Sequence, residues 1–107
     1  MERRSEILKL LGGDAFVAAA GATNMLGEDG EIWMEIGDNK SGATNMVVKL
    51  IANALYNIIF LRMEVSRHPG TMINDVCDPV IVNEFYNVEA DKLAETFEEF
   101  TGLRVRL

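Results

Sequence analysis

The sequence is poor in the residue types that form disulfides, carry catalysis or cross membranes. It has one cysteine, Cys77, so no disulfide can form within the chain, and one histidine, His68. A disulfide-rich secreted scaffold is therefore excluded, and a reducing, cytoplasmic environment is expected. The longest apolar stretch, residues 46–63, is interrupted by lysine, asparagine and arginine and is too polar to span a bilayer. We expect no secretory signal, because the first residues lack an apolar core segment.

Basic residues are also scarce. Ten lysines and arginines are outnumbered by seventeen aspartates and glutamates, which gives a net charge of −7. A surface that follows a phosphate backbone needs clustered cations, so direct binding of nucleic acid is not expected. An acidic surface instead favours partners of positive potential, including proteins that themselves hold DNA or RNA.

The length of 107 residues predicts a single domain, residues 1–107. A domain of this size hides roughly two thirds of its unfolded surface, so a hydrophobic core can stabilise it without a metal or a disulfide. Apolar residues make up 49% of the chain and charged residues 25%, a balance typical of folded globular proteins.

Helices are predicted near both ends of the chain. Residues 2–11 carry apolar side chains on one side, and two glycines end that helix. A second short helical turn over residues 15–20 follows, with Asp14 as its N-cap. Near the other end, Asn87 is expected to cap a helix over residues 88–100, which a glycine ends.

The middle of the chain predicts strands. Residues 23–26 and 31–36 flank a Gly-Glu-Asp-Gly turn, and the second run alternates apolar with polar residues, as in a strand with one buried face. Residues 44–65 fit either one helix or a hairpin. Their content of Val, Ile, Tyr and Phe favours two strands, 45–51 and 55–65.

A last strand is expected over residues 79–85, after a proline that an edge strand tolerates. Together these elements predict an α+β fold. The sheet should be antiparallel, with three to five strands, and the N-terminal and C-terminal helices should pack on one of its faces.

Few residues are candidates for catalysis or for metal binding. His68 precedes a Pro-Gly pair, and no orienting partner for a catalytic base is evident, so a turn residue is the favoured interpretation. Cys77 lies between Asp75 and Asp78, whose negative charges disfavour a reactive thiolate, so a buried inert thiol is favoured. None of these residues has a recognised metal-ligand spacing. We therefore expect no catalytic residue, no metal and no cofactor.

Two features are candidates for binding a partner. The predicted C-terminal helix carries four carboxylates, and their like-charge pairs and position near the negative end of the helix dipole oppose stability. These carboxylates are Asp91, Glu95, Glu98 and Glu99. They suit either a basic partner surface or simple solvation. Trp33 lies opposite the apolar residues of its predicted strand, where it is either a solvent-facing anchor or core beneath a helix.

Several short motifs follow one another along the chain. They are a helix-ending Gly-Gly, a nearby Phe, a Gly-Ala, a strand-opening Leu-Tyr and a closing Leu, Phe and Thr-Gly-Leu, here Gly12-Gly13, Phe16, Gly21-Ala22, Leu55-Tyr56, Leu93, Phe97 and Thr101-Gly102-Leu103. In this order they resemble small uncharacterised proteins of about this length from phages, plasmids and conjugative elements. The resemblance implies an α+β fold and a mobile-element origin, and it supplies no catalytic residues.

These observations favour a non-enzymatic, protein-binding accessory protein of a mobile element. Since carboxylates can occupy a basic nucleic-acid channel by charge complementarity, the specific hypothesis is an inhibitor of a host defence factor, of the anti-CRISPR type. Two alternatives stay open. One is a small enzyme that uses His68 or Cys77. The other is an oligomeric protein that sequesters a small molecule or nucleotide between chains, with basic residues such as Arg62, Arg67, Arg104 and Arg106.

Overall fold

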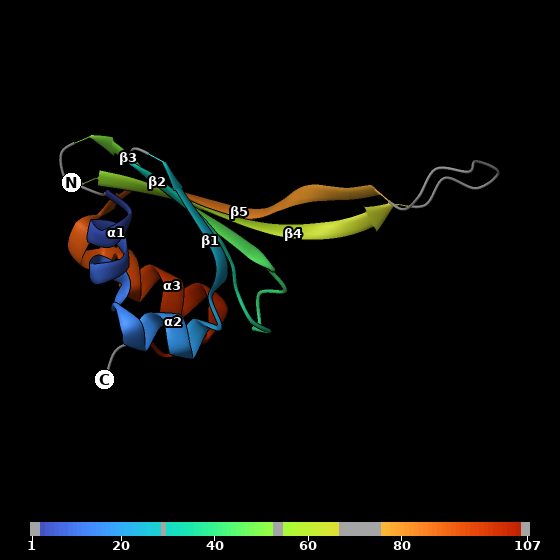
Figure 1. The fold of residues 1–107 in the computed structure, drawn as a ribbon, viewed down its shortest axis with the longest axis horizontal. Helices are drawn as coiled ribbons and strands as arrows, with labels where there is room; N and C mark the ends of the chain where they lie inside the picture. The colour runs from blue at the N-terminus through green and yellow to red at the C-terminus, as the bar shows by residue number, and fades with distance from the viewer. Residues whose placement is uncertain (1–2, 29, 53–54, 67–75, 106–107) are drawn as a thin grey trace.

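The computed structural model describes residues 3–28, 30–52, 55–66 and 76–105 and contains one five-stranded antiparallel sheet (Figure 1). The elements in chain order are α1 (Arg3–Leu11), α2 (Asp14–Ala20), β1 (Thr23–Glu28), β2 (Glu31–Glu35), β3 (Asn45–Ala52), β4 (Leu55–Ser66), β5 (Val76–Glu89), a 3₁₀ turn η1 (Ala90–Lys92) and α3 (Leu93–Thr101). The strands pair in sequence order, β1-β2-β3-β4-β5, so the sheet is a meander. The predicted α+β class and antiparallel sheet are confirmed.

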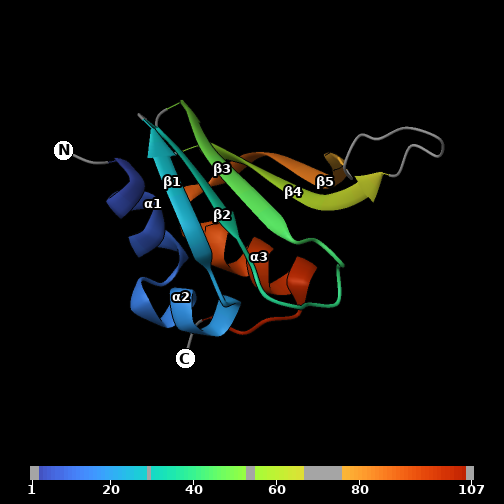
Figure 2. The ribbon, with the colours of Figure 1, turned by 45° about the vertical axis from the view of Figure 1, so that its right-hand side comes forward.

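The three helices cover one face of the sheet, and no helix of the described residues lies on the other face (Figures 1 and 2). Helix α1 packs against α3 and against β1 and β2. Strands β4 and β5 continue past the other strands as a two-stranded ribbon, paired out to Ser66 and Val76 (Figure 1). The prediction that the helices of both chain ends share one face of the sheet is therefore confirmed.

Alternation along the strands decides which side chains face the helices. Apolar residues at every second position of β2, β3 and β4 are buried and paired with one another across the sheet, namely Ile32, Met34, Met46, Val48, Ile58 and Phe60. Burial of an apolar side chain of this size contributes about 1.5–3 kcal/mol. The inner face of the central strands is thus the floor of the hydrophobic core.

All five phenylalanines lie in one cluster between the helices and the sheet. The ring centroid of Phe97 in α3 lies 5.0 Å from that of Phe16 in α2 and 6.3 Å from that of Phe60 in β4. Phe100 lies 4.4 Å from Phe60 and 5.5 Å from Phe85 of β5. Aromatic pairs at such distances add about 0.5–1.5 kcal/mol beyond their burial. The cluster joins α2 and α3 to the sheet.

The helical layer meets the sheet in a close backbone approach between Gly21 and Gly37. The Gly37 N–H donates to the carbonyl oxygen of Ala20 at 2.7 Å. A Cβ on Gly21 would lie 3.3 Å from the Cα and N atoms of Gly37, and Gly21 has a φ of 63°, which disfavours a side chain. Glycine at these two positions therefore lets α2 end directly against the end of β2.

The hairpin interpretation of residues 44–65 is confirmed, and the single-helix alternative is wrong. Strands β3 and β4 pair in antiparallel register from Asn45 opposite Leu61 to Ala52 opposite Leu55. The residues expected to link them, Asn53 and Ala54, lie outside the described part of the chain.

The first predicted hairpin is also present, with a longer first strand and a second strand that ends one residue earlier than expected, at Glu35. Strand β1 extends to Glu28, which pairs with Glu31 of β2. Gly27 and Glu28 therefore belong to a strand and not to the turn.

The C-terminal helix is shorter than the sequence predicts. Strand β5 extends beyond the predicted residues 79–85 at both ends, and η1 follows it, so the helix begins at Leu93 and not at residue 88. Val88 pairs with Tyr56 of β4 and packs against the core. This cross-strand pairing outweighs the local helical periodicity.

Neither predicted side-chain cap forms. Asn87 lies in β5 with a φ of 55°, at a shift of register, and its N–H donates to the Oδ1 atom of Asn57 at 3.2 Å. Asp14 is the first residue of α2, and Gly13 takes the cap position without a side-chain hydrogen bond. Both residues match a helix-capping pattern in the sequence, but neither side chain caps a helix in the structure.

Replacing Phe97 with alanine should lower the free energy of unfolding by about 3–5 kcal/mol, because a fully buried ring with two ring neighbours is lost. Phe97→Leu should cost less, since leucine refills much of the volume. Urea unfolding followed by circular dichroism measures both variants. A loss below about 1 kcal/mol for Phe97→Ala would contradict the central place of this ring.

Candidate interaction surfaces

The carboxylates predicted on the C-terminal helix are divided by the fold. The buried side of α3 consists of Leu93, Ala94, Phe97 and Thr101. Glu95 is half-buried and Glu99 is exposed, and Asp91 is exposed on η1. We call Asp91, Glu95 and Glu99 the acidic row. Lys92 forms an ion pair with Glu95 at 3.3 Å, and because both side chains remain largely in water the pair adds about 0–1 kcal/mol.

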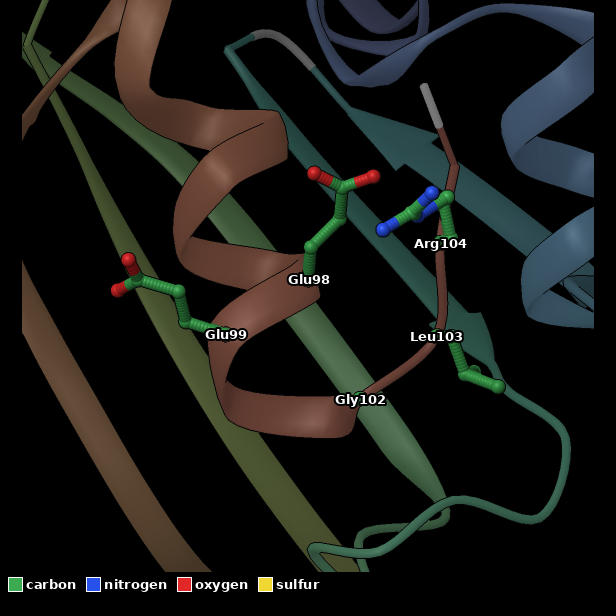
Figure 3. Close-up of a pocket in the computed structure, with 5 residues that line it drawn as sticks. All are labelled: Glu98, Glu99, Gly102, Leu103 and Arg104. Carbon is green, nitrogen blue, oxygen red and sulfur yellow. The ribbon is translucent and has the colours of Figure 1, made fainter. Parts of the chain in front are cut away.

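Glu98 is held by the chain that follows α3. Its Oε2 atom accepts a hydrogen bond from the backbone N–H of Val105 at 2.8 Å, and Val105 is buried. Figure 3 shows Arg104 and Glu98 pointing toward one another across the gap between α3 and this segment. Glu98 therefore fixes the return of the chain against the helix, a role that the local sequence pattern did not indicate.

An open cleft of about 210 Å³ lies at the C-terminal end of α3, and five residues line it, Glu98, Glu99, Gly102, Leu103 and Arg104 (Figure 3). Two carboxylates and one guanidinium give this cleft a mixed charge. The carboxylates would repel a phosphate group, so the lining does not suit a nucleotide. Arg62, another residue considered for a nucleotide pocket, lies on the β4–β5 ribbon opposite Val80.

Glu98→Ala should lower the free energy of unfolding by about 1–3 kcal/mol, because the buried end of the chain loses a charged hydrogen-bond acceptor. Glu99→Ala, which changes an exposed side chain one position along, should stay within about 0.5 kcal/mol. Thermal unfolding measures the pair of variants. Equal effects of the two substitutions would contradict the structural role of Glu98.

Trp33 lies on the uncovered face of the sheet, and 48% of its surface is exposed. Its indole N–H donates to the Oε1 atom of Glu31 at 2.7 Å, and Glu35 accepts a hydrogen bond from the side-chain amide of Asn24. Residues two apart on a strand share a face, so the indole lies between the two carboxylates. Of the two interpretations of Trp33, the solvent-facing one is confirmed.

An apolar stripe crosses this uncovered face from β1 to β5. Three cross-strand pairs lead from β1 to β4: Leu26 with Trp33, Trp33 with Val47, and Val47 with Ile59. A fourth pair, Leu61 with Ile81, extends the stripe along β4 and β5. We call its six residues the sheet stripe: Leu26, Trp33, Val47, Ile59, Leu61 and Ile81. Leu26 and Ile81 are 71% and 56% exposed. Val47 and Leu61 are buried and Ile59 is partly exposed, so the stripe is open to water mainly at Leu26, Trp33 and Ile81.

A second exposed aromatic residue, Tyr86, lies near the β5 end of the stripe. Glu84 pairs with Ile59, which places it on the uncovered face, and the Tyr86 hydroxyl donates to a carboxylate oxygen of Glu84. The hydrogen bond that Tyr86 donates to Glu84 is the main cause that raises the pKa of Tyr86 above its ordinary value of 10.0. The sequence analysis missed this pair. A Glu-x-Tyr spacing in a strand is the signal that could have found it.

Replacing Glu84 with glutamine should bring the pKa of Tyr86 back toward 10.0, because both the charged acceptor and its negative potential are removed. With the folded-state pKa raised, the hydrogen bond contributes fully to stability below pH 10.0, and the contribution is lost as the pH rises through the folded pKa. A pH titration of tyrosine ring carbons by NMR measures the shift, with Tyr86→Phe to assign the signal. The control variant is Glu31→Gln, because the Glu31 carboxylate accepts its hydrogen bond from Trp33. This variant should leave the pKa of Tyr86 unchanged.

The sheet separates the acidic row from Trp33. Helix α3 packs through Phe97 onto the face that carries Phe60, whereas Trp33 lies on the opposite face. The five residues predicted to bind a partner therefore form two surfaces, with the thickness of the sheet and a helix between them. A single flat partner surface cannot contact both.

Most of the residues considered for catalysis or for a nucleotide pocket cannot be placed in the fold. His68, Asp75, Arg67 and Arg106 lie outside the described residues, and Cys77 is placed only by its backbone, in β5 opposite Val65. In the part of the chain that the structure describes, no three His, Cys, Asp or Glu side chains are grouped so that they could hold a metal ion.

Comparisons with known proteins give no relative: no family model, no curated protein and no solved structure matches the chain. Among the helices of the described residues, none has the length and apolar character that a membrane crossing requires. The functional argument therefore depends on the two surfaces described above.

Proposed function

We propose that this protein is a non-enzymatic binder of another protein, one that presents a basic surface. The observation that carries the proposal is the exposed indole of Trp33, held between Glu31 and Glu35 on a sheet face that no described helix covers. Tryptophan is enriched among the residues that contribute most to protein interfaces. An indole flanked by carboxylates complements arginine or lysine, which stacks on the ring and pairs with the acids.

The distribution of charge supports a basic partner. Glu31 and Glu35 lie on either side of Trp33, and Glu84 lies at the far end of the sheet stripe. Lys49 shares the uncovered face as a cross-strand partner of Glu31. The net charge of −7 adds a negative field around the whole molecule, which accelerates association with a positively charged protein at low salt.

A more specific version uses the resemblance to proteins of mobile elements. In this version the partner is a host defence factor of the CRISPR type, whose nucleic-acid channel is lined by basic residues. A binder that fills part of that channel competes with DNA or RNA for the same cations. The Trp33 surface supplies the short-range contact, and the overall acidity supplies attraction from a distance.

The first test compares capture of proteins from a host lysate by the wild-type protein and by a Trp33→Ala variant. The wild type should retain a basic, nucleic-acid-binding protein, identified by mass spectrometry. The variant should bind that protein at least about tenfold more weakly, because a central anchor is lost. Equal retention by both proteins, or release of the partner unaffected by added nucleic acid, would contradict the proposal.

A charge-reversed variant shows in the same assay whether the acidic row acts by long-range attraction or by direct contact with the partner. Asp91→Lys, Glu95→Lys and Glu99→Lys together should slow association with the captured partner at low salt and leave dissociation nearly unchanged. The effect should fade near physiological ionic strength, where the screening length is about 8 Å. The matched control reverses Glu6, Asp14 and Asp38, which are exposed elsewhere. A larger effect of the row than of the control on dissociation would instead make the row a contact surface.

A further inference from the structure

Two similar pairs lie on the uncovered face, each made of an aromatic ring and a carboxylate that accepts its hydrogen bond. One is Trp33 with Glu31 on β2, and the other is Tyr86 with Glu84 on β5. We propose that these pairs are two subsites for cationic side chains of one partner surface, joined by the apolar stripe between them. This inference rests on the proposed function and names the chemistry of its partner, an apolar strip flanked by arginine or lysine.

Each pair leaves a carboxylate with free capacity for a cation. A carboxylate has about four lone-pair sites, and the ring N–H or O–H uses one of them. An arginine placed over the ring can therefore stack on its face and donate to the remaining carboxylate oxygen. A tyrosine hydroxyl is protonated at neutral pH, so the Tyr86 O–H remains a donor to Glu84 there.

The spacing of the two pairs sets the spacing of the cations. Strands β2 and β5 are separated by three interstrand spacings of about 4.8 Å, which gives about 14 Å between the subsites. An α-helix rises about 1.5 Å per residue and returns to the same face every 3.6 residues, so two cations about eleven residues apart lie on one face at about 16 Å, and long arginine side chains can adjust to the subsites. Between them, apolar side chains of the helix would lie over the partly exposed Ile59.

The edges of the sheet disfavour a partner that adds a strand. Strand β5 has two shifts of register against β4 and contains Pro79, which has no N–H to donate. Strand β1 has a shift of register between Thr23 and Leu26, and Asn24 there has a φ of 50°. Bulges of this kind bend an edge and interrupt its hydrogen-bonding groups. A partner therefore gains more from the uncovered face than from either edge.

Charge complementarity also favours a cationic partner over a second copy of this chain. Packing two copies face to face would bring Glu31, Glu35 and Glu84 of each toward an equally acidic surface, and like charges brought together at an interface oppose binding. A basic partner neutralises the same carboxylates. The second copy is therefore the alternative that the test must detect.

The probe is a synthetic helical peptide of about 17 residues, with leucines along one side and two arginines about eleven residues apart on that same side. Two control peptides have glutamine in place of both arginines, or the arginines about four residues apart. Anisotropy of labelled peptide measures the affinity for the wild-type protein, for Trp33→Leu, Tyr86→Leu and Glu84→Gln, and for Glu6→Gln as a control on α1. Since Trp33 is the only tryptophan, acrylamide quenching of its fluorescence reports directly whether the peptide covers it.

The peptide with widely spaced arginines should bind about tenfold more tightly than either control peptide and should protect Trp33 from the quencher. Tyr86→Leu and Glu84→Gln should each weaken that peptide about threefold to tenfold and leave the glutamine peptide unaffected. Glu6→Gln should change nothing. Circular dichroism confirms that each variant is folded.

The other outcomes overturn one or both claims. If Trp33→Leu weakens binding and the changes at Tyr86 and Glu84 do not, the second subsite is refuted and the proposed function stands. If the widely spaced peptide leaves Trp33 unprotected, both the subsites and the proposed contact surface fail. If sedimentation shows that the protein alone forms dimers in which Trp33 is protected, a second copy occupies the face and the inference is wrong.

Discussion

Contact among the phenylalanine rings is the interaction on which the two-layer arrangement depends. Helices of seven to nine residues, such as α1, α2 and α3, are too short to be stable by themselves in water. Helices α2 and α3 persist because Phe16, Phe97 and Phe100 link them to Phe60 and Phe85 of the sheet, and α1 packs on α3, β1 and β2 with Ile7 and Leu11 in the core. All of these rings lie on one side of the strands. The helices therefore gather on that side, and the opposite face of the sheet stays uncovered.

The uncovered face pairs apolar side chains with a rim of acids. Val47 and Leu61 are only 3% and 8% exposed although no described helix lies over them. Leu26, Trp33 and Ile81 remain open to water. The carboxylates around the stripe keep such a face hydrated when no partner is bound. In the proposed function the same carboxylates select a partner of positive potential.

The sequence predicted the elements best where a repeating pattern agreed with the tertiary contacts. Alternation around Trp33 predicted the strand but left open whether a helix covers the indole, and the β-branched residues of β3 and β4 outweighed a helical period. The pattern failed where pairing between distant residues decided the outcome. Val88 joined a strand through Tyr56, which moved Tyr86 from an expected connector into β5 beside Glu84. Glu98 looked like any outward carboxylate, because the return of Val105 toward it is not encoded in a local period.

The two acidic surfaces differ in what physics allows them to do. A contact on the sheet stripe places the cations of a partner within hydrogen-bond distance of Glu31 and Glu84, where the attraction is strong and directional. The acidic row would then act through the thickness of the sheet and a helix, roughly 20 Å, which is more than twice the screening length of about 8 Å at physiological salt. Over that distance its pull is almost fully screened. The acidic row, which was the most evident feature of the sequence, thus contributes mainly to the overall negative field. Glu31 and Glu84, which lie in strands next to the exposed rings, are placed where a bound partner could gain binding energy.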